Sequence, residues 1–188
     1  MPKRIANKFI LAEDVEQQNL VRRYLERCGH TREFRLAPLP CKGIGGSGEK
    51  YVRDKYPEQV QACRSSLGIN TSALLIVIVD ADKRTTDERR KQLADSLSAA
   101  GKPPRTDGEP IVVLIPKRHV ETWIHALLNE LVDEDTDYTK APYNSPTRED
   151  IRSAAETLYA WTRPNAKVGP TSPSSLTDSI PEWRKIPA

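Results

Sequence analysis

Three acidic residues occupy positions from which their side chains could act together on one ligand. Glu13 follows a short apolar run, Asp80 follows the longest one, 73–79, and Asp82 lies two residues further on. A spacing of two lets Asp80 and Asp82 point the same way in an extended chain. Crowded carboxylates repel one another unless a cation screens them, and hard oxygen ligands select Mg²⁺ or Mn²⁺ over zinc. The pattern therefore predicts that Glu13, Asp80 and Asp82 bind a divalent metal.

A simpler interpretation of the same acids stays open. Asp80 and Asp82 are also typical of the turns that follow strands, and an isolated D-x-D pair is common by chance. The pair follows the most apolar segment of the chain, and a further acid follows the first apolar segment. This placement favours the metal site.

The elements that must position these acids alternate along the chain. Apolar, β-branched runs predict strands, and amphipathic stripes predict helices between them. The strands are expected at 8–12, 34–39, 73–79 and 111–115. The helices are expected up to Gly29, at 49–67, from Thr85 to about Gly101, over 120–128 and at 147–161. With right-handed crossovers, this order predicts an α/β fold, a doubly wound and mainly parallel sheet of about four strands with helices on both faces.

A length of 188 residues fits one domain and a tail. We expect the domain at 1–163, with its core at about 8–128 and a C-terminal helix, and an irregular tail rich in Pro and Ser at 164–188. Ile180 and Trp183 are the expected anchors of this tail. Ligands of open parallel sheets bind beyond the carboxyl ends of the strands, where the three acids are expected.

Two runs of residues resemble a known family. The residues Phe9-Ile-Leu-Ala-Glu13, and later Leu75-Ile-Val-Ile-Val-Asp80-Ala-Asp82, resemble the Toprim domain of topoisomerases, primases and nucleases of the OLD (overcoming lysogenization defect) class. The resemblance covers about residues 8–128. It implies a Toprim- or Rossmann-like fold in which the glutamate and the D-x-D pair bind Mg²⁺ for phosphodiester chemistry. Many Toprim proteins have glycine directly after the glutamate, whereas this chain has Asp14.

The segment 115–123 is similar to the region of small Toprim nucleases that supplies another acid and a basic group. In this interpretation Glu121 faces the metal crevice, and Lys117 or Arg118 stabilises the charge that develops on the phosphate. The alternative is that Glu121 is an ordinary helix-start acid and the basic side chains are solvated. His119 is either a group for proton transfer or a surface histidine.

A glycine-rich loop at 42–50 permits close approach of its backbone to a ligand. It fails the Walker pattern for nucleoside triphosphates, because Glu49 stands where that pattern requires lysine. Its backbone amides, together with Lys42, Lys50 and Arg53, are candidates for binding a substrate phosphate. The alternative is a plain loop.

With the resemblance, these residues predict a Mg²⁺- or Mn²⁺-dependent nuclease that cleaves DNA or RNA. Glu13, Glu121 and Lys117 are the expected catalytic residues, and Arg118 joins the basic residues of the loop in binding nucleic acid. The resemblance also implies the effector of a bacterial defence module with a separate ATPase as its protein partner. A non-catalytic Toprim- or receiver-like interaction module is the alternative, since Asp80 and Lys117 roughly match a phosphoacceptor site.

Composition favours a cytoplasmic protein without a membrane partner. Cys28, Cys41 and Cys63 are odd in number and widely spaced, so they indicate neither a disulfide framework nor a zinc site. The N-terminal residues do not form a signal-peptide pattern. Apolar runs stay well below the ~20 residues needed to cross a bilayer.

Overall fold

The described residues build one parallel sheet. The structure is a computed structural model that describes residues 5–31, 34–40, 47–67 and 72–187. The strands are β1 (Ile5–Leu11), β2 (Phe34–Leu36), β3 (Ser72–Ile78) and β4 (Ile111–Leu114). Their order in the sheet is β2-β1-β3-β4, and each neighbouring pair is parallel. The sheet confirms the predicted strands.

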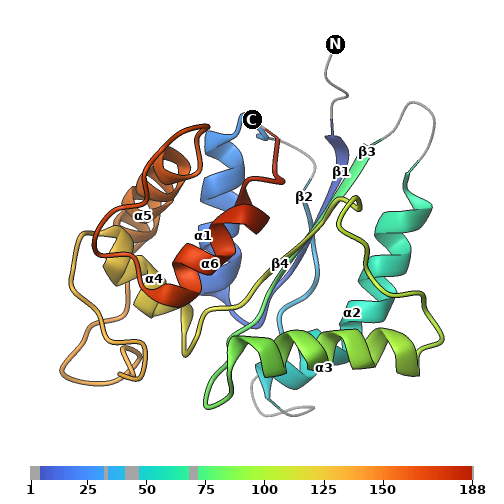
Figure 1. Cartoon of the computed structure of the whole chain (residues 1–188), viewed down its shortest axis with the longest axis horizontal. Coiled ribbons are helices and arrows are strands. Elements are labelled where there is room, and N and C mark those ends of the chain that lie inside the picture. The colour runs from blue at the N-terminus through green and yellow to red at the C-terminus, as the bar shows by residue number, and fades with distance from the viewer. Residues whose placement is uncertain (1–4, 32–33, 41–46, 68–71, 188) are drawn as a thin grey trace.

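Helices cover both faces of this sheet. On one face lie α1 (Val15–Arg27), α4 (Val120–Leu127), α5 (Arg148–Trp161) and α6 (Ser174–Trp183), and on the other lie α2 (Gly48–Ser65) and α3 (Thr86–Ala99) (Figure 1). Two separate apolar cores result, one against each face. The doubly wound α/β fold predicted from the sequence is therefore confirmed.

β3 lies at the centre because its side chains are apolar in both directions. The side chains from Ala73 to Ile78 are at most 1% exposed. Ile76 and Ile78 enter the core under α1, whereas Leu75 and Val77 enter the core under α2 and α3. A strand buried on both faces needs such an uninterrupted apolar run. β2, at the edge, is three residues long and only partly buried, which limits pairing with other chains.

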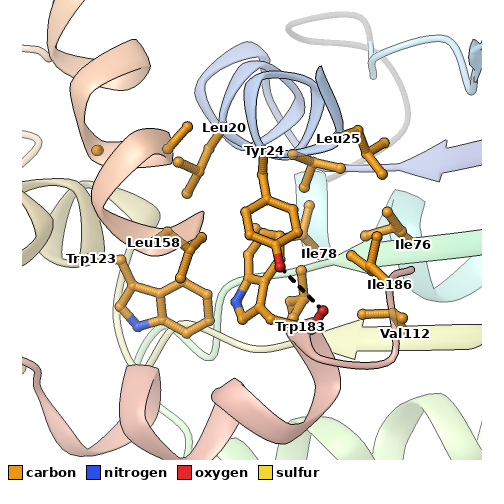
Figure 2. Packing of buried hydrophobic residues seen from close by; sticks show 14 of the residues in the cluster. Leu20, Tyr24, Leu25, Ile76, Ile78, Val112, Trp123, Leu158, Trp183 and Ile186 are labelled. Atoms are coloured by element: carbon orange, nitrogen blue, oxygen red, sulfur yellow. Dashed lines mark hydrogen bonds between the residues drawn. The ribbon is translucent and has the colours of Figure 1, made fainter. Parts of the chain in front are cut away.

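The prediction of an irregular segment at 164–188 is wrong for residues 174–183, which form α6. Leu176, Ile180 and Trp183 recur at helical spacing and are at most 3% exposed. Ile180 and Trp183 thus anchor this segment as expected. Trp183 stacks at 4.6 Å between ring centroids on Tyr24 of α1 (Figure 2). Burial of this apolar stripe stabilises a helix whose Pro and Ser content gives it little intrinsic propensity.

The order of the strands defines one crevice. From β1 the chain moves outward to β2, and then it returns past β1 to form β3 and β4. The connections after β1 and β3 therefore diverge to opposite faces, and ligands of open α/β sheets bind at such a switch point. Glu13 follows β1 and Asp80 follows β3, so both acids flank this crevice.

A search of the described helices for a stretch that is both long and apolar enough to cross a membrane found none.

Candidate functional site

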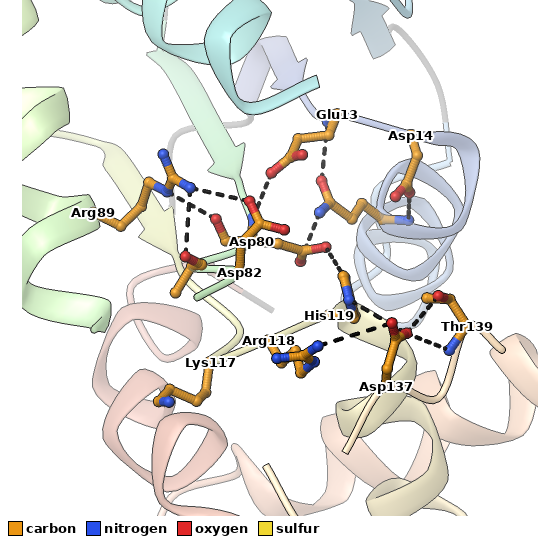
Figure 3. A network of polar contacts seen from close by, with 12 residues as sticks. Glu13, Asp14, Asp80, Asp82, Arg89, Lys117, Arg118, His119, Asp137 and Thr139 are labelled. Atoms are coloured by element: carbon orange, nitrogen blue, oxygen red, sulfur yellow. Dashed lines mark hydrogen bonds and ion pairs between the residues drawn. The ribbon is translucent and has the colours of Figure 1, made fainter. Parts of the chain in front are cut away.

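Glu13 and Asp80 are in direct contact at the switch point. The backbone N–H of Asp80 donates to Oε1 of Glu13 at 2.5 Å. Gln17, which is fully buried, joins the same residues from α1: its Nε2 donates to Oδ1 of Asp80 at 2.8 Å, and its Oε1 accepts from the backbone N–H of Glu13 at 3.0 Å (Figure 3). These three bonds fix the end of β1 to the end of β3.

Asp14 begins α1 and explains why no glycine is needed after the glutamate. Its backbone is extended, with φ −143°, and its carboxylate accepts from the backbone N–H of Gln17 at 2.8 Å. An N-cap aspartate satisfies one of the free N–H groups of the helix. The departure from the common Toprim pattern therefore leaves an ordinary helix start, which also places Gln17 beside Asp80.

The start of α2 lies directly over Glu13. A Cβ atom added to Gly48 would lie 2.9 Å from Cβ and 3.0 Å from Oε2 of Glu13. Gly48 is therefore required by the close approach of two chain segments. The rest of the glycine-rich loop before Ser47, including Lys42, lies outside the described residues.

Asp80 and Asp82 have different partners. The chain remains extended through Ala81, whose N–H donates to the carbonyl of Pro116 at 2.8 Å. Asp82 then adopts a left-handed conformation with φ 56°. Its carboxylate, 43% exposed, pairs with Nη2 of Arg89 at 3.2 Å, whereas Asp80 is 4% exposed and faces Gln17.

Arg89 of α3 holds the acidic segment in place, and the sequence analysis missed it. Its side chain is 2% exposed, and Nε donates to the carbonyl of Asp80 at 2.8 Å. Nη1 donates to Glu49 at 2.7 Å. The available signal was its spacing, because Arg89 lies four and eight residues before Leu93 and Leu97 on the buried stripe of α3.

The acids of this site carry more negative charge than their surroundings compensate. Burial, and then repulsion from Asp80, raises the pKa of Glu13 to about 9. Burial also raises the pKa of Asp80 well above its usual range, with repulsion from Asp14, Glu121 and Asp82 as further causes. The pKa of Glu121 is raised chiefly by burial as well. A group of buried carboxylates with raised pKa values stabilises a bound proton or cation.

The segment before α4 lines the other side of the site. Glu121 is 9% exposed and lies close enough to Asp80 to raise its pKa. His119 lies between two carboxylates, with Nδ1 3.4 Å from Oδ2 of Asp80 and Nε2 3.5 Å from Oδ1 of Asp137. The Nζ atom of Lys117 lies 3.1 Å from Asp135. The structure thus brings Glu121 to the acids and turns Lys117 toward an exposed loop.

The predicted phosphate-binding residues divide into two places. Lys50 pairs with Asp54 at 3.0 Å, and Arg53 pairs with Glu49 at 3.3 Å. Arg53 lines a shallow hollow between α2 and α3. Arg118 instead lines a pocket of about 570 Å³ beside the acids, which it shares with Asp82, Lys83, Arg84, Asp137 and Lys140.

The acids lie close together, but they do not form a complete set of metal ligands. Within residues 5–31, 34–40, 47–67 and 72–187, no three acidic, histidine or cysteine side chains are grouped so that they could hold a metal ion as they stand. Oε1 of Glu13 and Oδ1 of Asp80 accept hydrogen bonds from protein groups. The donor set is chemically suited to Mg²⁺, because it consists of carboxylate oxygens.

Comparison with protein-family models matched none of them, and comparisons with curated proteins and with solved structures likewise gave no match.

Proposed function

We propose that this chain is a nuclease that uses Mg²⁺ or Mn²⁺ to cleave phosphodiester bonds in DNA or RNA. One observation carries the proposal. Glu13, Asp80 and Glu121 are buried at the switch point with raised pKa values, and Asp82 lies beside them. The resemblance of the Glu13 and D-x-D segments to Toprim domains supports the same chemistry.

Glu13, Asp80 and Asp82 are the residues that would hold the metal. Oε2 of Glu13 makes no hydrogen bond within the part of the chain that the structure describes, so it is free to bind a ligand. A bound divalent ion would stabilise charge on the phosphate and lower the pKa of a bound water. Without the ion, Glu13 holds a proton at neutral pH, because its pKa is raised to about 9.

The residues of the α4 segment supply the remaining roles. Glu121 adds a carboxylate for proton transfer, and Glu13 serves as acid or base. Arg118 faces the pocket beside the acids and would bind the nucleic-acid backbone. Lys117 reaches the substrate only after leaving Asp135. In keeping with the resemblance, a separate ATPase is the proposed protein partner, and the free cysteines Cys28 and Cys63 fit the reducing cytoplasm.

A phosphoacceptor receiver module is the second candidate, since the strand order β2-β1-β3-β4 with an acid after β3 also suits that class. One observation favours the nuclease instead. Lys117, the candidate receiver lysine, pairs with Asp135 and not with Asp80.

Cleavage assays test the proposal directly. Mixed DNA and RNA substrates are incubated with Mg²⁺, Mn²⁺ or EDTA, and wild type is compared with Asp80→Asn and Asp82→Asn. The matched control is Asp95→Asn, an exposed acid of α3 that pairs with Lys91. We expect metal-dependent cutting that both site variants reduce at least about 100-fold and the control retains.

The same variants separate cleavage from metal binding. Melting temperatures with and without Mg²⁺ are measured in parallel for all four proteins. Absence of cleavage together with absence of a metal-induced increase in wild type refutes the nuclease and its metal site. A phosphorylated Asp80 after incubation with a phosphodonor, detected by mass, would establish the receiver module in its place.

A further inference from the structure

Asp137 is the centre of a second charged cluster beside the acids. Its Oδ2 lies 2.7 Å from Nζ of Lys140 and 3.9 Å from Nη2 of Arg118. Its Oδ1 accepts from the Thr139 hydroxyl at 2.5 Å and from the Thr139 N–H at 3.2 Å. His119 approaches the same oxygen at 3.5 Å (Figure 3). A single carboxylate therefore faces donors from the segment just before α4 and from its own loop.

The Asp137 carboxylate does not satisfy all the hydrogen-bond donors around it. A separation of 3.9 Å is too long for a hydrogen bond from Arg118. The Nε atom of Arg118 is buried and has no hydrogen-bond partner among the residues that the structure describes. A buried guanidinium N–H without a partner is destabilising. The cluster thus has spare donor capacity.

The cluster opens into the pocket of about 570 Å³. Lys83 and Arg84, in the turn after Asp82, are exposed at its rim and add positive charge. Asp82 and Glu49, which also lines the pocket, pair with Arg89, and Asp137 pairs with Lys140, so the acids of the pocket already have cationic partners. The remaining charge in the pocket is positive, which favours an anionic ligand.

We propose that the pocket between the 82–84 turn and the 137–140 loop is a binding site for a phosphate group of a nucleic-acid strand, and that the Asp137 carboxylate occupies this site in the free protein. A phosphate has more acceptor oxygens than a carboxylate and can serve Arg118 through two parallel bonds. When the phosphate enters, Asp137 leaves and releases Lys140 and Arg118 to the ligand.

His119 relates this pocket to the cleavage site. Its ring spans the gap between Asp80 at 3.4 Å and Asp137 at 3.5 Å. One imidazole therefore separates the proposed phosphate site from Asp80, so the bound group is a neighbour of the phosphodiester that is cleaved. This identification of the ligand as a strand phosphate rests on the proposed nuclease, whereas the anion site itself does not.

Binding measured without metal tests the site independently of cleavage. Inorganic phosphate and a single-stranded hexanucleotide without terminal phosphates are titrated in EDTA by calorimetry. The variants are Asp137→Asn, Arg118→Gln and Lys140→Gln. Lys91→Gln is the control, because Lys91 is 75% exposed on α3 and pairs with the likewise exposed acid Asp95, away from the pocket.

Asp137→Asn is expected to bind the hexanucleotide about tenfold more tightly, because a like charge at this distance is removed. Arg118→Gln and Lys140→Gln are expected to bind the hexanucleotide about tenfold more weakly. Each should also reduce the salt dependence of hexanucleotide binding by the amount expected for about one lost phosphate contact. The control is expected to match wild type. Melting temperatures verify folding, and Lys140, which is 76% exposed, gives a variant that cannot be lost to misfolding of the core.

The outcomes separate this site from the proposed function. Unchanged hexanucleotide binding by Asp137→Asn and Lys140→Gln overturns the site even if the protein cleaves nucleic acid. Binding with the expected pattern supports the site even if cleavage is never found. Binding of inorganic phosphate without the hexanucleotide overturns the assignment to a nucleic-acid strand.

Discussion

Replacing Glu13 by glutamine should stabilise the metal-free protein above neutral pH. The amide keeps an oxygen that accepts the N–H of Asp80, which now donates to Oε1 at 2.5 Å. It removes a carboxylate whose pKa is raised from 4.5 to about 9 by burial and by repulsion from Asp80. The substitution thus removes a titratable group and conserves the packing.

The sign follows from proton linkage. A carboxyl group with a raised pKa binds its proton more tightly in the folded state than in the unfolded state. Its contribution to stability is complete below the unfolded pKa of 4.5 and is lost as pH rises toward about 9. Wild type should therefore become less stable between pH 5 and pH 8, and Glu13→Gln should lose less.

The magnitude has an upper limit from the same pKa values. Between the unfolded value of 4.5 and pH 8, each unit corresponds to about 1.4 kcal/mol, which gives a limit of about 5 kcal/mol. Asp80 and Glu13 repel each other, so their protons are released as a coupled pair and part of this energy remains in the variant. We expect a gain of about 2–3 kcal/mol at pH 8 and almost none at pH 5.

Urea unfolding in EDTA measures this difference, with tryptophan fluorescence as the signal because Trp123 and Trp183 are fully buried. Glu58→Gln on α2 is the control, since Glu58 is 64% exposed and pairs with Lys55 on the surface. Mg²⁺ should then stabilise wild type at pH 8 by about 2.7 kcal/mol at 100 times its Kd, and should stabilise Glu13→Gln much less. Equal pH dependence of wild type and Glu13→Gln would refute the reasoning.

Two further substitutions examine the framework of the site. Arg89→Met should lower the free energy of unfolding by about 3–5 kcal/mol, because the buried carbonyl of Asp80 loses its donor and the carboxylates of Asp82 and Glu49 lose the buried cation that they share. Urea unfolding beside the exposed Arg90→Met measures this loss, and a loss below 1 kcal/mol would contradict the role. Gly48→Ala should cost about 1–3 kcal/mol through the 2.9 Å contact with Glu13 and weaken Mg²⁺ stabilisation, whereas the exposed Gly108→Ala, with no atoms nearby, should change neither.

The strands of the sheet could be predicted because each strand is specified by residues that are adjacent in the sequence. An apolar run such as 73–79 is compatible with few environments other than a strand buried on both faces, and alternation with amphipathic helices leaves few topologies. The positions of Glu13 and Asp80 at the strand ends follow from that topology. α6 was missed because its propensity is low, and burial of the stripe Leu176, Ile180 and Trp183 stabilises it.

The polar partners within the site were less predictable. Contacts between segments far apart in the chain give the site its polar partners, Gln17, Arg89 and Asp137. Such hydrogen bonds do not recur at a fixed spacing in the sequence, so no periodic pattern reveals them. Arg89 has a recognisable signal in the sequence, because it occupies a position on the buried stripe of α3 where an apolar residue is expected. Asp137 could not have been identified from the sequence, since it is one of several acids in a loop without a helical or strand period.

Two opposite charge imbalances lie next to each other in this site. Around Asp80, buried carboxylates repel one another and have raised pKa values. Around Asp137, hydrogen bonds from Lys140 and Thr139 hold the pKa of the carboxyl well below its usual range, and Arg118 still has an unused donor. A ligand that relieves only one imbalance leaves the other in place. A divalent ion on the first cluster and a phosphate on the second would relieve both, and His119 stands between them. The proposed pairing of metal and nucleic-acid backbone therefore predicts that each ligand increases the affinity for the other.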